Sequence, residues 1–154
     1  MWPVVIILMI TSIVGGMLSL CEPAKRSGDK TTAVALNFMV WHQTALTFVQ
    51  AHGGAAYAGA MTQGTLAGQF PGWYRSEGPW QSYAAGGLVV SYPTGRIGIV
   101  PDGRFRARLV DASFDDAGVG YSFGGNFQSS AAAISFPLPV SLPDNTPVYF
   151  SRLN

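Results

Sequence analysis

Residues 31–52, TTAVALNFMVWHQTALTFVQAH, decide the fold, because they form the longest regular pattern after the N-terminal segment. Apolar side chains recur every three or four positions, which is the spacing of one face of an α-helix. They are Val34, Phe38, Trp41, Ala45 and Phe48, and Asn37, Thr44 and Thr47 mark the opposite, polar side. Gly53 and Gly54 then end the helix. A helix with one apolar face needs a second layer to bury it, and we expect that layer to be a β-sheet.

The sheet is expected downstream, where short runs of β-branched and aromatic residues alternate with turn sequences. Two hairpin-type connectors, Pro93-Thr94-Gly95 and Pro101-Asp102-Gly103, separate three predicted strands at 88–92, 96–100 and 104–110. Further strands are expected at 119–123, 131–136 and 148–152, and the proline-spaced residues 137–140 should be extended and edge-like. The pattern predicts an α+β domain over residues 31–154, with the amphipathic helix packed on an antiparallel sheet.

The N-terminal residues 2–20, WPVVIILMITSIVGGMLSL, contain no charge. This length matches the roughly 20 apolar residues that cross a bilayer as a helix, so residues 1–21 are predicted to be a transmembrane anchor and residues 22–30 a polar linker. The segment lacks the basic start and small-residue cleavage site of a secretory signal. Leu20 before Cys21 does not fit a lipoprotein site, and Gly15 and Gly16 lie too late for a prepilin leader. An uncleaved anchor fits best.

Two further features of this region bear on how the anchor sits and associates. Ser12 and Gly16, and likewise Gly15 and Ser19, are four residues apart, a spacing that lets a second helix approach closely. Lys25, Arg26 and Lys30 follow the segment, and the positive-inside rule counts them toward a cytoplasmic domain. The composition of the domain argues for the opposite side.

That composition is poor in charge. Only 11% of the 154 residues are charged, the net charge is +1, and there are 19 Gly and 10 Pro. A typical soluble domain has about 25% charged residues, so the balance is more typical of an extracytoplasmic, β-rich domain. The near-zero charge disfavours nucleic acid as a partner, and a single cysteine cannot form an intramolecular disulfide.

No catalytic, metal or cofactor motif emerges from the sequence. His42 and His52 are ten residues apart on one helix and cannot share a metal, and His42 is expected on the helix surface. Asp115 and Asp116 are adjacent and read as a solvated turn, and Gly124-Gly125 lacks the Lys-Ser/Thr of a phosphate loop. The sequence therefore favours a non-enzymatic protein that needs no cofactor.

Three arginines form a candidate partner contact. Arg104, Arg106 and Arg108 alternate with apolar residues, so a strand over 104–110 would place all three guanidinium groups on one face. The ordinary interpretation is a solvated face balanced by nearby aspartates. The functional interpretation is a docking surface for an acidic partner.

An aromatic region offers an alternative function. Trp73, Tyr74, Trp80 and Tyr83 lie close together in the sequence, and aromatic rings stack on sugars and bases. A binding module for cell-wall glycan or DNA is thus the alternative to an assembly protein. Exposed rings would favour the binding module, and buried rings would belong to the core.

The layout as a whole resembles the PilM family of type IVb pilus systems. The resemblance rests on the Met1-Trp2 start, the helix residues 37–41 with Val49-Gln50-Ala51, the sequence Phe70-Pro71-Gly72-Trp73, then Trp80, residues 87–92 and Leu142-Pro143-Asp144. It is also similar to the pilin layout of a helix on an antiparallel sheet. The resemblance to the PilM family implies a small inner-membrane component of pilus assembly with a periplasmic domain and with other assembly proteins as partners. Self-association is an open option. The resemblance transfers no catalytic residue.

Overall fold

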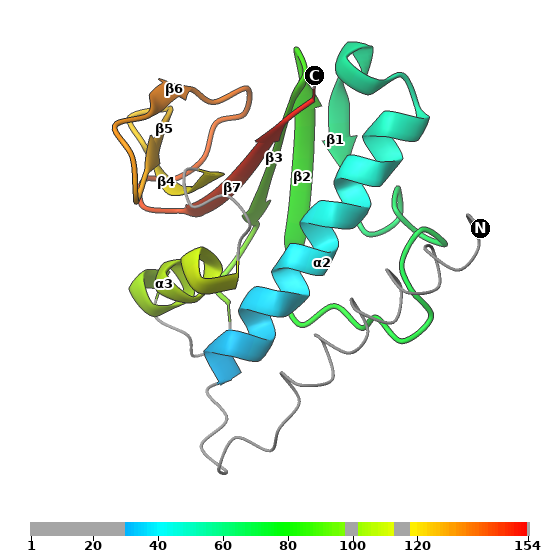
Figure 1. Ribbon diagram of the computed structural model, residues 1–154, viewed down its shortest axis with the longest axis horizontal. Coiled ribbons are helices and arrows are strands. Elements are labelled where there is room, and N and C mark those ends of the chain that lie inside the picture. Colours follow the sequence, from blue (N-terminus) through cyan, green and yellow to red (C-terminus); the bar gives the residue numbers. More distant parts are fainter. Residues whose placement is uncertain (1–29, 98–101, 113–117, 154) are drawn as a thin grey trace, which may run out of the picture.

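The computed structural model describes residues 30–97, 102–112 and 118–153 as an α+β domain (Figure 1). The elements are α2 (Lys30–Ala51), η1 (Gly54–Ala56), β1 (Gly59–Met61), β2 (Trp80–Ala85), β3 (Leu88–Pro93), α3 (Asp102–Ala112), β4 (Val119–Phe123), β5 (Asn126–Ser129), β6 (Ser135–Pro137) and β7 (Pro147–Arg152). The predicted anchor, most of the linker and the small residues Ser12, Gly15, Gly16 and Ser19 lie outside these ranges. Within them, no helix is both long and apolar enough to cross a membrane.

The strands form one antiparallel sheet in the order β1-β2-β3-β7-β4-β5-β6. The C-terminal strand β7 lies at its centre, because it pairs with β3 on one side (Val90 opposite Phe150) and with β4 on the other (Gly120 opposite Val148). Gly120 is required here, since a Cβ at this position would lie 2.1 Å from the carbonyl oxygen of Gln128. The last residues of the chain therefore join two halves that are built from earlier segments.

Both helices pack on one face of this sheet. Successive side chains of a strand point to opposite faces, and in β2 the buried positions Trp80, Ser82 and Ala84 alternate with half-buried ones. Aromatic rings join the layers. The ring of Phe38 in α2 lies 4.9 Å from Trp80 and 5.6 Å from Phe105 of α3, centroid to centroid. The helix face that the sequence predicts is thus the face that is buried.

The other face of the sheet carries a second apolar cluster. Val90 and Tyr92 of β3 and Val148 and Phe150 of β7 contribute to it, together with Phe127 of β5. Phe127 packs against Phe136 of β6, with centroids 5.0 Å apart. In Figure 1, β4, β5 and β6 gather on the side of β7 away from α2. The central strands are therefore buried on both faces.

The prediction of a strand over 104–110 is wrong, because these residues belong to helix α3. The alternation of arginine with apolar residues fits a strand, but Phe105 and Leu109, four positions apart, equally fit one face of a helix. Both side chains are fully buried. The seven residues 104–110 fit both a strand and a helix by their pattern alone, and their packing in the folded domain decides for the helix.

Two other strand predictions need correction. Arg96 and Ile97 have no strand structure, and the rest of the predicted strand 96–100 is outside the described residues. The prediction over 131–136 is too early, because β6 begins only at Ser135, and the strand β5 at 126–129 was not predicted. The predicted strands 88–92, 119–123 and 148–152 are confirmed as β3, β4 and β7.

A buried polar network fixes α2 on the sheet, and it overturns the expectation that His42 lies on the surface. His42 is 1% exposed, with Nδ1 2.7 Å from Oγ of Ser91 in β3 and Nε2 2.9 Å from Oγ of Ser151 in β7. Trp41 Nε1 donates to Ser82 Oγ at 2.9 Å, and the hydroxyl oxygens of Ser82 and Ser91 share a hydrogen bond of 2.6 Å. Thr44, expected on the polar side, is also buried and donates to the Val40 carbonyl oxygen.

Replacing a buried ring on α2 should destabilise the domain. Phe38 and Trp41 are fully buried, so either alanine substitution should lower the free energy of unfolding by about 3–5 kcal/mol. Urea unfolding of the purified protein measures this change. Phe123→Ala is the control: Phe123 is 54% exposed, and its change should stay within about 0.5 kcal/mol. Equal losses at buried and exposed positions would contradict the packing.

Acid should weaken the domain through His42. Burial lowers the pKa of His42 from 6.5 to about 3, so between these values the unfolded chain binds a proton that the folded protein does not. Stability is therefore fully present above about pH 6.5 and falls as the pH falls, by about 1.4 kcal/mol per pH unit in this window. Urea unfolding of wild type and His42→Gln at several pH values measures the difference. Identical pH dependence in the two proteins would contradict the assignment.

Candidate functional site

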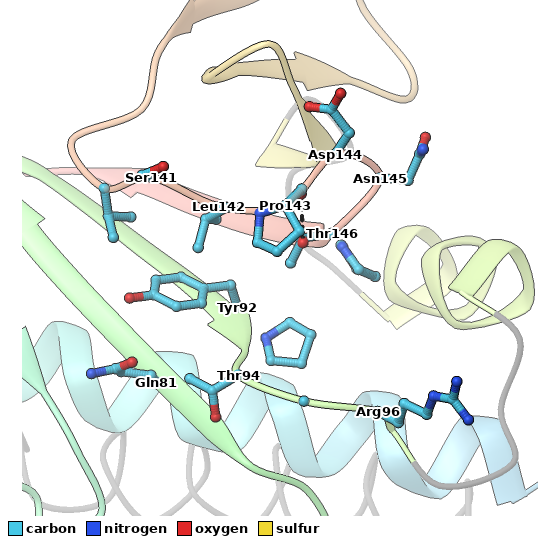
Figure 2. Close-up of a pocket in the computed structure, with 14 residues that line it drawn as sticks. Gln81, Tyr92, Thr94, Arg96, Ser141, Leu142, Pro143, Asp144, Asn145 and Thr146 are labelled. Carbon is cyan, nitrogen blue, oxygen red and sulfur yellow. Dashed lines mark hydrogen bonds between the residues drawn. The ribbon is translucent and has the colours of Figure 1, made fainter.

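A groove with a volume of about 530 Å³ lies beside the second apolar cluster. One wall is the connection 140–147 that leads into β7, and the other is the end of β3 with the residues that follow it, up to Arg96. Figure 2 shows the first wall above and Gln81, Thr94 and Arg96 below, with Tyr92 between them. The groove therefore opens on the sheet face opposite α2.

The upper wall is held in one shape by a tight turn. Asn145 adopts a positive φ of 65°, which asparagine tolerates better than most residues. Its backbone N–H donates to the carbonyl oxygen of Ser122 at 2.8 Å, and Ser122 Oγ donates to the carbonyl oxygen of Pro143. The Gly124 N–H donates to a carboxylate oxygen of Asp144 at 2.8 Å. These bonds attach the turn to β4 and its hairpin.

The lower wall is anchored as well. The backbone N–H and the hydroxyl of Thr94 both donate to the carbonyl oxygen of Pro79, at 2.8 and 2.9 Å. The Tyr92 side chain is almost completely buried, and burial, followed by its neighbour Tyr83, raises the pKa of the phenol. Arg96 is exposed, so its guanidinium places a positive charge beside a mostly neutral hollow.

Of the three predicted contact arginines, Arg106 and Arg108 do not share a face, and the side chain of Arg104 lies outside the described part of the chain. On a helix, residues two apart point in nearly opposite directions, whereas residues four apart align. Arg106 turns to the sheet, where its guanidinium carbon lies 4.8 Å from the centre of the Tyr121 ring. Arg108 forms a 3.0 Å salt bridge with Asp111. The single-face arrangement of Arg104, Arg106 and Arg108 is therefore absent, because α3 is not a strand.

The aromatic region is divided between core and surface. Trp80 is 5% and Tyr74 6% exposed, whereas Trp73 is 72% exposed. Asn37 of α2 holds this region: its Oδ1 accepts from Trp80 Nε1 at 2.8 Å and from the Glu77 N–H at 3.0 Å. The three rings thus do not form one platform, and Trp73 alone projects from a loop that is fixed to the helix.

A smaller hollow of about 250 Å³ lies beside Trp73. It is formed between the outer side of α2 and the loop that carries the tryptophan. Its lining is free of charged side chains and comprises Val40, Gln43, Thr44, Thr47, Gln69, Pro71 and Trp73. Apolar and neutral side chains at an exposed tryptophan are typical of a protein contact.

Neither hollow contains a histidine. His42 contacts two serines, as a catalytic base would, but it lies inside the core and both of its nitrogens are bonded there. His52 is exposed at the end of α2, with Nδ1 2.8 Å from the Phe48 carbonyl oxygen. No group of three potential metal ligands occurs within residues 30–97, 102–112 and 118–153.

Sequence reasoning did not identify either hollow. The groove is assembled from β2, β3 and a connection that is about 50 residues further along the chain, a proximity that no local pattern records. Its turn could have been anticipated from Pro143-Asp144-Asn145, a sequence rich in turn formers. The second hollow has a clearer signal, since residues 31–74 contain no Asp, Glu, Lys or Arg.

The fold is shared with a protein of known structure. The crystal structure of a protein assigned as PilM from Escherichia coli B7A superposes with a TM-score of 0.54. The alignment covers 85% of this chain and 98% of that one, at 16% sequence identity. At this identity the similarity shows the fold alone. No curated protein matches the chain.

The family match is independent of that superposition. The PilM family matches residues 6–150, which is nearly the whole sequence. The match spans both hollows and the helices and strands from α2 to residue 150, within β7. It confirms the resemblance that the sequence suggested and supports a role in pilus biogenesis. This chain belongs to the PilM family.

Proposed function

We propose that this protein is a non-catalytic inner-membrane component of type IVb pilus assembly that acts through protein–protein contacts. Its groove would bind an extended, acidic segment of another assembly protein. The observation that carries the proposal is the groove itself, which has two walls fixed by hydrogen bonds and an exposed arginine beside it. A pre-formed surface loses little conformational entropy when a partner binds.

The chemistry of the groove fits a peptide-like partner. Gln81, Thr94 and Ser141 offer polar side chains, while Leu142 and the prolines offer apolar contact. Arg96 adds a positive charge on the lower wall, which would favour a carboxylate over a neutral or basic segment there. The carboxylate of Asp144 on the upper wall already accepts from the Gly124 N–H. The sequence suggested that Arg104, Arg106 and Arg108 contact an acidic partner. The proposal assigns that contact to Arg96 instead.

Membrane attachment is the second part of the proposal. The uncharged residues 2–20 supply a segment long enough to span a bilayer. Placing the domain in the periplasm is supported by its low charge, although Lys25, Arg26 and Lys30 favour the opposite orientation. Anchoring would hold the groove close to the membrane-bound components that it binds.

A binding module for glycan or DNA is the alternative function. It would depend on Trp73, the one exposed ring of the four that suggested it. A single exposed indole can stack on a sugar or a base. The same ring beside a neutral hollow also fits a protein partner, and the near-zero net charge gives DNA no electrostatic attraction.

Reversing the charge at the groove should abolish piliation. Arg96→Glu would repel an acidic segment, and because Arg96 is exposed the free energy of unfolding should change by only about 0.5 kcal/mol. The pili are counted by electron microscopy on cells that carry the variant in place of the wild type. Arg108→Glu on α3 is the control and should pilate normally. Normal piliation by Arg96→Glu at wild-type abundance would reject the groove as the working surface.

A reporter joined after Asn154 should reveal a periplasmic domain. Alkaline phosphatase folds to its active form only outside the cytoplasm, because it requires disulfides, so the fusion should be active in intact cells. A fluorescent protein that matures only in the cytoplasm should remain dark at the same position. The reverse result would move the domain to the cytoplasm and overturn the proposed localisation.

A further inference from the structure

The outer side of α2 carries a regular stripe that no other described element covers. Its members are Leu36, Val40, Gln43, Thr47 and Gln50, and all five are exposed or half-exposed. The intervals between them are four, three, four and three residues. Paired helices contact each other through positions with this alternating spacing, and here two apolar and three neutral polar residues occupy them. The stripe runs along α2, a helix of 22 residues whose opposite face packs against the sheet.

The stripe is neutral throughout. No residue from 31 to 74 is formally charged, so the outer side of α2 beyond its first residue, Lys30, and the adjoining loop up to Tyr74 lack charge. Contact with a membrane surface usually relies on basic residues that attract anionic lipid, and none is present here. The central part of protein–protein interfaces, by contrast, is depleted in charge.

The surface next to the stripe combines a projection with a hollow. Trp73 projects, and the 250 Å³ hollow beside it shares Val40, Gln43 and Thr47 with the stripe. The Thr47 hydroxyl donates to the carbonyl oxygen of Gln43 at 3.0 Å, so it is already bonded within its own helix. A two-fold interface needs a projection and a receiving hollow on the same surface, since each copy presents the same patch to the other.

We propose that a second copy of this chain binds here, with the α2 stripes side by side and the Trp73 of each copy against the hollow of the other. Because the surface is uncharged, bringing it against itself creates no like-charge repulsion. The two helices would run parallel, since each α2 begins directly after a membrane anchor. That orientation rests on the proposed function.

Cysteine cross-linking in the full-length, membrane-bound chain tests this arrangement. In a Cys21→Ser background, Gln43→Cys or Thr47→Cys places one thiol on the stripe. Parallel two-fold packing brings equivalent positions together, so mild oxidation should convert these variants to disulfide-linked dimers. Ser141→Cys, an exposed position in the groove on the other face, is the matched control and should stay monomeric.

A charge placed on the stripe provides the second readout. Thr47→Arg would bury two like charges at the interface, so the mass of the detergent-solubilised protein measured by light scattering should fall from two protomers to one. The far-UV circular dichroism spectrum should match wild type, because Thr47 is exposed and each protomer keeps its fold. Stripe-specific disulfides together with this loss of mass support the dimer.

The dimer is overturned by a wild-type protein that is monomeric, by disulfides that form equally at Ser141, or by stripe thiols that link only to other proteins. These outcomes are separable from failure of the proposed function. A monomeric protein that still requires Arg96 for piliation would overturn the dimer and leave the role in assembly standing. A dimer that pilates with Arg96→Glu would do the reverse.

Discussion

The packing of α2 against the sheet depends on a histidine that must find two hydrogen-bond partners inside an apolar core. His42 meets Ser91 and Ser151 on adjacent strands, and Trp41 beside it meets Ser82 on a third. An unpaired polar group in such a site costs about 1–3 kcal/mol. Sliding the helix by one turn would keep apolar contacts but break every one of these bonds. The network therefore selects one position of the helix.

Once α2 is fixed, both candidate surfaces are placed. Asn37 ties the tryptophan loop to the helix, which sets Trp73 beside the outer stripe. On the face opposite α2, the central strands carry the second apolar cluster, and Gln81 and Tyr92 line the groove beside it. The neutral stripe lies on the outer side of α2 and the groove on the opposite face of the sheet, so the two surfaces face away from each other. Under the two proposals, one protomer has room to engage a second copy and an acidic partner at the same time.

The 16% identity to the Escherichia coli structure fits this division of roles. A fold is preserved when apolar positions keep their spacing and approximate size, and such positions can exchange among many residues. Surfaces have no such constraint, and they define what a pilus component binds. The similarity therefore carries over the helix on the sheet but leaves the groove and the stripe to be judged from this chain.

The sequence by itself determined the long helix, three central strands and the α+β class, because 22 residues of helical periodicity and strongly apolar strands leave little ambiguity. It also gave the family. Tertiary structure alone decided the short elements: residues 104–110 fit a strand and a helix equally well until Phe105 and Leu109 packed against α2. It likewise decided that His42 is buried and that Arg96 lies beside a groove, since both depend on residues distant in sequence. A local pattern records the period of a segment but not the neighbours that the folded chain brings to it.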